Sequence, residues 1–142
     1  MVYLPVEQAV IVPSTKGVKS QKKVSDAEFR RRVNNVRRFL ARRYGGFTDV
    51  QQTGGFVLKN GKLVREKVVR VGSFATRKDD VKHKKALMNQ IHKWREKWGQ
   101  ESVGYEREGD LYVVEPTKTK VIKRIKKKRL KSPIKKLKRK KK

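Results

Sequence analysis

The last 26 residues of the chain, Thr117–Lys142, contain sixteen Lys or Arg residues and no acidic residue. Like charges at this density repel one another, so this segment is not expected to fold until a polyanion neutralises it. The preceding 116 residues carry 25 basic and 13 acidic residues, and their last acid, Glu115, is followed by Pro116. We therefore expect a globular domain at 1–116 and a Lys/Arg-rich extension at 117–142, disordered or helical when bound.

The charge and composition of the whole chain narrow the classes of function. Its 142 residues have a formal net charge of +28, which predicts a polyanionic partner, and their 35% hydrophobic content still allows a core. Cysteine is absent, which excludes disulfides, thiolate metal ligands and cysteine nucleophiles. No apolar run approaches the roughly 18–20 residues of a membrane span, and Met1–Pro13 lacks the basic start of a signal peptide. We expect no membrane partner and an intracellular or particle-bound protein, with nuclear targeting through Lys126–Arg129 and Lys138–Lys142 if the host is eukaryotic.

The first half of the domain has the pattern of a strand followed by a helix. Tyr3–Val12 is apolar and β-branched toward its end, which predicts a strand, and the Lys/Ser/Gly-rich Ser14–Lys23 predicts a loop. Ser25-Asp26-Ala27-Glu28 is a capping box, in which Ser25 accepts from the Glu28 amide and the Glu28 carboxylate reaches back. Apolar residues follow at helical spacing from Phe29 to Tyr44, and Gly45-Gly46 ends the helix.

A hairpin is predicted next. Phe47–Leu58 and Lys62–Ala75 flank Asn60-Gly61, which favours a type I′ turn with positive φ at both residues. Gly54-Gly55 predicts a bulge or bend in the first arm.

A second helix and a second hairpin complete the domain. Thr76-Arg77-Lys78-Asp79 is another capping-box candidate, and the apolar stripe that follows contains Trp94 and Trp98, which we expect in the core. Two short strands then flank Glu108-Gly109-Asp110. The order β-α-β-β-α-β-β favours an α+β fold, a split β-α-β (ferredoxin-like) two-layer sandwich with both helices on one face of an antiparallel sheet.

No pattern in the sequence indicates an active site. His83 and His92 lie nine residues apart on one predicted helix, which places them on opposite sides of it, and Asp79-Asp80 in the first turn is explained by the helix dipole. Four other acids are isolated among basic neighbours and fit surface pairing better than a metal-dependent nuclease site: Asp49, Glu66, Glu101 and Asp110. We therefore expect no enzyme, and no catalytic, cofactor-binding or metal-binding residues.

The polar face of the first predicted helix is dominated by arginine. Seven arginines, Arg32 among them, occupy it, and no acid occurs from Phe29 to Tyr44, whereas an ordinary solvated face alternates charges. The planar guanidinium grips phosphate in a bidentate manner, which favours a nucleic-acid interface. With the clusters of the extension, the predicted nucleic-acid-binding residues are Arg30, Arg31, Arg37, Arg38, Arg42, Arg43, Lys123, Arg124, Lys126, Lys127, Lys128, Arg129, Lys135, Lys136, Lys138 and Arg139.

Several short segments resemble a known group of proteins. They are Pro13-Ser14-Thr15 at the end of the first strand, Arg43–Thr48, Gly54-Gly55-Phe56, Asn60–Glu66 and the terminal hairpin Gly104–Val114. In these turn and strand patterns, residues 3–115 look like short uncharacterised proteins encoded by phages and archaeal viruses. That group brings no assigned catalytic residues. The basic domain with a Lys-rich tail also resembles a ribosomal protein in architecture.

The leading hypothesis from the sequence is a non-enzymatic, nucleic-acid-binding structural protein that contacts the phosphate backbone of DNA or RNA within a viral or other nucleoprotein assembly, together with other proteins of that particle. Three alternatives stay open. The chain could be a structural constituent of a ribosome or other RNA particle, a nuclease-like enzyme using Asp49, Glu66 or Asp110, or a protein-interaction module with a localising tail.

Overall fold

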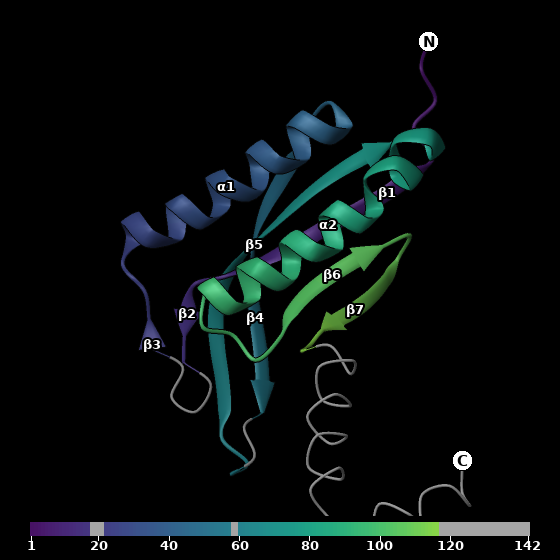
Figure 1. Ribbon diagram of the computed structural model, residues 1–142. Coiled ribbons are helices and arrows are strands. Elements are labelled where there is room, and N and C mark those ends of the chain that lie inside the picture. Colours follow the sequence, from purple (N-terminus) through teal and green to yellow (C-terminus); the bar gives the residue numbers. More distant parts are fainter. Residues whose placement is uncertain (18–21, 58–59, 117–142) are drawn as a thin grey trace, which may run out of the picture.

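The computed structural model describes residues 1–17, 22–57 and 60–116, which form a sheet with two helices packed on one of its faces (Figure 1). The main sheet has five strands in the order β4-β5-β1-β6-β7, and every neighbouring pair is antiparallel. Strands β2 and β3 form a separate two-stranded sheet. The elements are β1 (Val6–Pro13), β2 (Thr15–Lys16), β3 (Lys22–Lys23), α1 (Asp26–Tyr44), β4 (Thr48–Val57), β5 (Leu63–Ala75), α2 (Arg77–Lys97), β6 (Val103–Arg107) and β7 (Asp110–Val114).

This arrangement confirms the predicted α+β class with an antiparallel sheet and two helices. The expected loop at Ser14–Lys23 is partly wrong, because it contains β2 and β3. Neither helix in the described part of the chain combines the length and apolar character that crossing a membrane requires. The extension at 117–142 lies outside the described residues, as do residues 18–21 and 58–59.

Both helices begin at the predicted caps. The Ser25 hydroxyl accepts from the Glu28 amide at 3.1 Å, and the Thr76 hydroxyl accepts from the Asp79 amide at 3.1 Å. Each bond satisfies an amide that the first turn of a helix leaves without a partner. Helix α1 ends at Gly45, whose φ of +94° is readily adopted only by a residue without a β-carbon.

The turn predicted at Asn60-Gly61 differs from the one that the structure shows. The last pair of the ladder is Val57 with Leu63, so five residues connect β4 and β5, whereas a type I′ turn at Asn60-Gly61 would need a two-residue connection. The Asn60 side chain instead accepts from the Lys62 amide at 2.9 Å. The β6–β7 turn, in contrast, has positive φ at both Glu108 (+52°) and Gly109 (+86°). The predicted bulge at Gly54-Gly55 is also wrong, because pairing with β5 continues through both residues.

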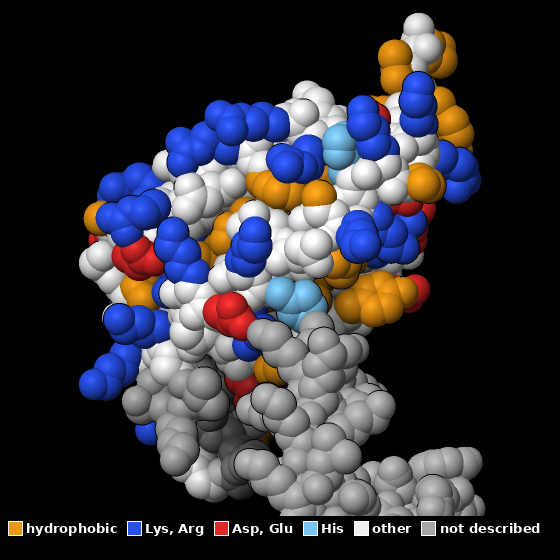
Figure 2. All heavy atoms as spheres, viewed as in Figure 1, with side chains coloured by type: hydrophobic (Ala, Val, Ile, Leu, Met, Phe, Trp, Pro, Cys, Tyr) orange, Lys and Arg blue, Asp and Glu red, His pale blue; other side chains and the backbone are white. Residues whose placement is uncertain are grey.

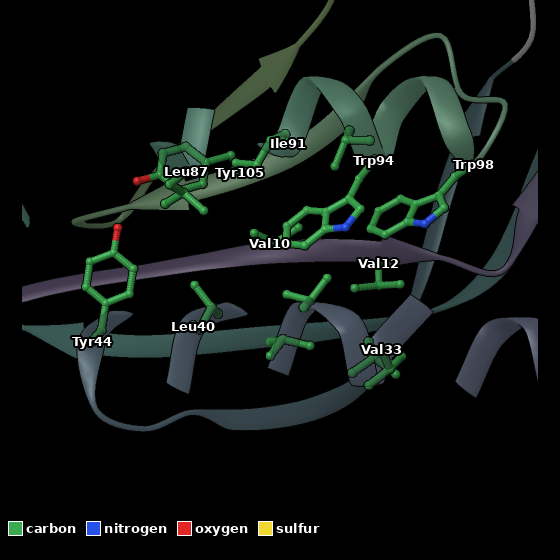
Figure 3. Packing of buried hydrophobic residues seen from close by; sticks show 14 of the residues in the cluster. Val10, Val12, Val33, Leu40, Tyr44, Leu87, Ile91, Trp94, Trp98 and Tyr105 are labelled. Carbon is green, nitrogen blue, oxygen red and sulfur yellow. The ribbon is translucent and has the colours of Figure 1, made fainter. Parts of the chain in front are cut away.

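The core lies between the helices and the covered face of the sheet (Figure 3). Val10 and Val12 of β1 contribute from the sheet and Leu40 from α1, and all three are fully buried. Trp94 and Trp98 are 4% and 1% exposed, and their rings stack with centroids 5.6 Å apart. The prediction that both tryptophans pack in the core is confirmed. Alternate residues of β1 and its neighbours point to the opposite face, where Arg70 pairs with Glu7 and Glu106.

Candidate active site

The turn that follows β1 is held by a carboxylate from β5. The Ser14 amide donates to Glu66 Oε2 at 3.1 Å, and the Thr15 hydroxyl donates to the same oxygen at 3.0 Å. The Ser14 hydroxyl donates to the Lys67 carbonyl at 2.5 Å. Both bonds to Glu66 end on the same carboxylate oxygen, Oε2.

The same turn is fixed from the core side by a buried arginine. Arg32 of α1 is 2% exposed and donates to the carbonyls of Pro13 at 2.8 Å and Thr15 at 2.9 Å. Its guanidinium also lies 5.6 Å from the Trp98 ring centroid. Burial lowers the pKa of Arg32, while the pairing with Glu28 acts in the opposite direction and favours the charged form. Arg32 therefore supports the turn. The prediction that it lies on the polar arginine face of the first helix is wrong, because its side chain is buried.

A second contact joins the turn to the segment after α2. The Gln100 side-chain amide donates to the Thr15 carbonyl at 2.6 Å, and the Gly17 amide donates to the Gly99 carbonyl at 3.0 Å. Residues distant in sequence are thus brought to one end of the sheet. Rigid support of this kind is what a binding site needs.

A hollow of about 330 Å³ lies beside this turn. Its volume falls in the range of about 300–1,000 Å³ that is typical of small-molecule sites. Ile11, Pro13 and Val68 provide apolar surface, and the loop into β6 forms the other wall. The described lining contains two acids, Glu66 and Glu101, and no Lys or Arg. In a chain of net charge +28, this is a local site of opposite sign.

The sequence did not group the residues of this hollow and of the turn beside it into one site, although it named Glu66 in the nuclease-like alternative. Glu66 and Glu101 are classed there as surface-pairing acids, and Ser14 and Thr15 as part of a loop. Glu66 in fact holds the backbone of the turn, and Ser14 and Thr15 are 4% and 6% exposed. For Ser14, Thr15 and Glu66 the available signal was their membership of Pro13-Ser14-Thr15 and Asn60–Glu66, two of the segments that carry the resemblance to viral proteins, whereas Glu101 lies in neither.

The three acids named in the nuclease-like alternative, Asp49, Glu66 and Asp110, do not lie together in the structure. Asp49 lies on β4 and Asp110 on β7, which are the opposite outer strands of the sheet. Asp49 accepts from Arg37 Nε at 2.5 Å. No group of three or more His, Cys, Asp or Glu residues that could hold a metal occurs among the described residues. Glu66 is therefore not part of a nuclease-like acidic site with these two residues.

The six predicted arginines of α1 do not form one uniform surface. Arg31 pairs with Glu28, and Arg37 pairs with Asp49 and lies over the Phe47 ring. Arg30 is exposed at the start of the helix. The other three, Arg38, Arg42 and Arg43, line a groove against α2. The ten predicted residues of the extension lie outside the described residues: Lys123, Arg124, Lys126, Lys127, Lys128, Arg129, Lys135, Lys136, Lys138 and Arg139.

Comparison with known proteins gives a structural likeness to an enzyme. No protein-family model matches the chain, and no curated protein matches it. Among solved structures, a phage SAM lyase in complex with S-methyl-5′-thioadenosine aligns with a TM-score of 0.55 and 20% sequence identity. The alignment covers 82% of this chain and 95% of that one. A structure of a phage SAM lyase in the apo state aligns with a TM-score of 0.50, 20% sequence identity and the same coverage. The likeness is one of fold.

These matches overturn the function expected from charge. The phage SAM lyase of these two structures is an enzyme, and this finding contradicts the expectations of a non-enzymatic protein and of a structural nucleoprotein of a virion or ribonucleoprotein particle. Net charge reports on the average surface and carried no information about the local hollow at Glu66.

Proposed function

We propose that this protein is an enzyme that binds a sulfonium nucleoside of the S-adenosylmethionine type and cleaves it to a neutral thioether. The observation that carries the proposal is the hollow beside the β1 turn, whose described lining has two carboxylates and no basic residue in a chain of net charge +28. The fold likeness to the phage SAM lyase supports the same reading.

The charge of the hollow suits this class of substrate. A sulfonium carries a permanent positive charge on sulfur and has no hydrogen to donate, so it is stabilised by nearby anions. Glu66 presents one such anion, held in place through Oε2 by the Ser14 amide and the Thr15 hydroxyl. Glu101 is a second acidic residue in the lining of the same hollow. A phosphate-bearing substrate, in contrast, would be repelled by both.

A lyase reaction on S-adenosylmethionine breaks the bond between sulfur and the γ-carbon of the amino acid. Sulfur keeps the electron pair and leaves as S-methyl-5′-thioadenosine, which is neutral. Two routes balance the charge: the substrate's own carboxylate attacks the γ-carbon and gives a cyclic ester, or a base takes a proton from the β-carbon and gives an unsaturated amino acid. Glu66 acts as the sulfonium-binding anion in the first route and as the base in the second.

The test is a product assay on the full chain. Purified protein is incubated with S-adenosylmethionine, and S-methyl-5′-thioadenosine and the four-carbon product are measured by mass spectrometry. We expect release of the thioether, and a loss of about 10²-fold or more in kcat/KM for Glu66→Gln, the range seen when one electrostatic catalytic contact is removed. Gln keeps an oxygen acceptor for the Ser14 amide, so the fold is expected to survive.

The matched control is Glu115→Gln, which removes an exposed carboxylate that lies outside the lining of the hollow. It is expected to leave kcat/KM unchanged. Absence of the thioether with the wild-type protein, or a Glu66→Gln variant within threefold of it, would contradict the proposal. The four-carbon product distinguishes the two chemical routes.

We also infer that the topology is the ferredoxin-like arrangement. The order β4-β5-β1-β6, with α1 after β1 and α2 after β5, supports a split β-α-β sandwich to which β7 adds an edge strand.

A further inference from the structure

A second hollow lies on the helical side of the molecule, between α1 and α2. It has a volume of about 310 Å³. Phe39 and Trp94 line it, with their rings edge to face and their centroids 5.5 Å apart. Five cations surround these rings: Arg38, Arg42 and Arg43 from α1, and Lys93 and Lys97 from α2. Figure 2 shows Lys and Arg side chains gathered along both helices on this face.

None of these five cations forms an ion pair with another residue of the described chain. The described ion pairs involve other arginines: Arg31, Arg32, Arg37, Arg70, Arg95 and Arg107. Arg38 and Arg42 are one helical turn apart, as are Lys93 and Lys97, so each wall places like charges side by side. A ligand that carries negative charge would relieve this repulsion.

Two of the arginines are already ordered by uncharged neighbours. Arg38 donates to the Asn35 side-chain carbonyl at 2.8 Å. The Arg43 guanidinium carbon lies 3.9 Å from the centroid of the Phe39 ring. Both contacts restrict the side chain while leaving its charge available, which lowers the entropy cost of binding an anion.

The spacing of the cations indicates the kind of anion. Arg38 and Arg42 are one helical turn apart on α1, and Lys93 and Lys97 are one turn apart on α2, so the basic residues extend along both walls of the groove. A chain of phosphates presents negative charge along this whole length, whereas a single phosphate presents it at one point. The aromatic rings offer no free face for bases, because Trp94 is 4% exposed and Arg43 lies over Phe39. The groove is therefore suited to a backbone and not to base recognition.

We propose that the groove between α1 and α2 binds the phosphodiester backbone of a nucleic acid without sequence preference. This surface is separate from the carboxylate hollow, because one lies among the helices and the other beside the β1 turn at the end of the sheet. It adds a polyanion partner to an enzyme and does not replace the proposed activity.

The test compares two double variants of the full chain, so that the extension contributes equally to both. In the first, Arg38→Gln and Arg42→Gln remove two exposed charges of the groove. In the second, Lys62→Gln and Arg65→Gln remove two exposed charges at the far end of the β4–β5 hairpin. Binding of a fluorescein-labelled 20-nucleotide single-stranded DNA is measured by anisotropy from 100 to 400 mM salt.

We expect the groove variant to bind about tenfold or more weakly than the hairpin variant at the same salt. Its plot of log affinity against log salt should also be flatter by about 1.4, since each lost phosphate contact contributes about 0.7 for a single strand. Equal losses in the two variants would overturn the proposal, because the cations would then act only as diffuse charge. Displacement of the DNA by inorganic phosphate at matched phosphate concentration, beyond the effect of the same ionic strength of chloride, would overturn it in favour of a small phosphate ligand.

The activity assay keeps this result apart from the proposed function. Both double variants are expected to release S-methyl-5′-thioadenosine at the wild-type rate, since neither pair lines the carboxylate hollow. DNA binding that depends on Arg38 and Arg42 stands whether or not the chain cleaves a sulfonium nucleoside.

Discussion

A buried ion pair between α2 and β6 gives the sharpest test of how the fold is held together. Asp80 is 6% exposed and accepts two bonds from Arg107, at 2.5 Å and 2.8 Å. From the sequence alone, the interaction with the helix dipole accounts for both Asp79 and Asp80. The structure separates them, because Asp80 joins two elements 27 residues apart, whereas Asp79 lies beside it in the same first turn.

The variants Asp79→Asn and Asp80→Asn measure how differently the two acids contribute to the free energy of unfolding. Removing one partner of a buried ion pair costs about 3–5 kcal/mol, because the other charge is left unpaired. The Arg107 side chain is 22% exposed and regains some water, so we expect Asp80→Asn to lower the free energy of unfolding by about 2–3 kcal/mol. For a domain of this size, the loss corresponds to a fall in Tm of about 10 °C or more. Asp79→Asn loses only the dipole interaction, and we expect about 0.3–1 kcal/mol.

Acid titration adds a second signature of the same pair. The hydrogen bonds from Arg107 hold the pKa of Asp80 below its ordinary value of 3.8, so the folded state binds this proton less tightly than the unfolded state does. The stability that Asp80 contributes is therefore complete above that ordinary value and is lost as the pH falls through the lower, folded-state pKa. In urea unfolding, the free energies of unfolding of wild type and Asp80→Asn should differ by the full amount at pH 6, and this difference should become smaller below about pH 4. Equal effects of Asp79→Asn and Asp80→Asn, or a difference that does not vary with pH, would refute the reasoning.

Two further predictions concern the site itself. Arg32→Lys keeps the charge but loses the planar guanidinium that reaches the carbonyls of Pro13 and Thr15. We expect urea unfolding to show a loss of about 2 kcal/mol or more in the free energy of unfolding, and kcat/KM to fall with it, whereas the control Arg30→Lys, at an exposed position, changes that free energy by less than about 0.5 kcal/mol. Similar losses in both variants would contradict the role assigned to Arg32. The net charge of +28 repels a cationic substrate at long range, so kcat/KM for S-adenosylmethionine should rise between 10 and 150 mM salt in initial-rate assays, and a steady fall over that range would contradict the expected charge of the substrate.

Local signals in the sequence were sufficient for the helices. Ser25 and Thr76 both accept from the amide three residues on, and Gly45 ends α1 with positive φ, as expected from residues within one turn of each cap. The prediction of the β4–β5 turn was wrong because the register of the two strands determines the length of their connection. With Val57 opposite Leu63, the connection has five residues, and a two-residue I′ turn at Asn60-Gly61 no longer fits.

The candidate site depends on contacts that one sequence does not reveal. Glu66 is 51 residues from Thr15 and 35 residues from Glu101, and only the pairing of β5 with β1 and the loop after α2 bring them to one hollow. Each residue has an ordinary local explanation: an acid on a strand, a Ser-Thr pair in a loop, an acid after a helix. Periodicity assigns such residues to a surface, and it cannot say which parts of the surface meet.

Net charge fails as a guide to the substrate for a related reason. Arg32, Arg37, Arg70 and Arg107 all count toward +28, yet each is paired with a carboxylate and serves the fold. Screening limits the reach of the remaining charges to about 8 Å at physiological ionic strength, so the nearest groups determine the potential inside a small hollow. The charged residues that line the hollow beside the β1 turn are Glu66 and Glu101, and those that line the groove between the helices are arginine and lysine. The two proposed sites, one for a cation beside the β1 turn and one for an anion between the helices, are therefore compatible with a single strongly basic chain, because each potential is determined by nearby residues.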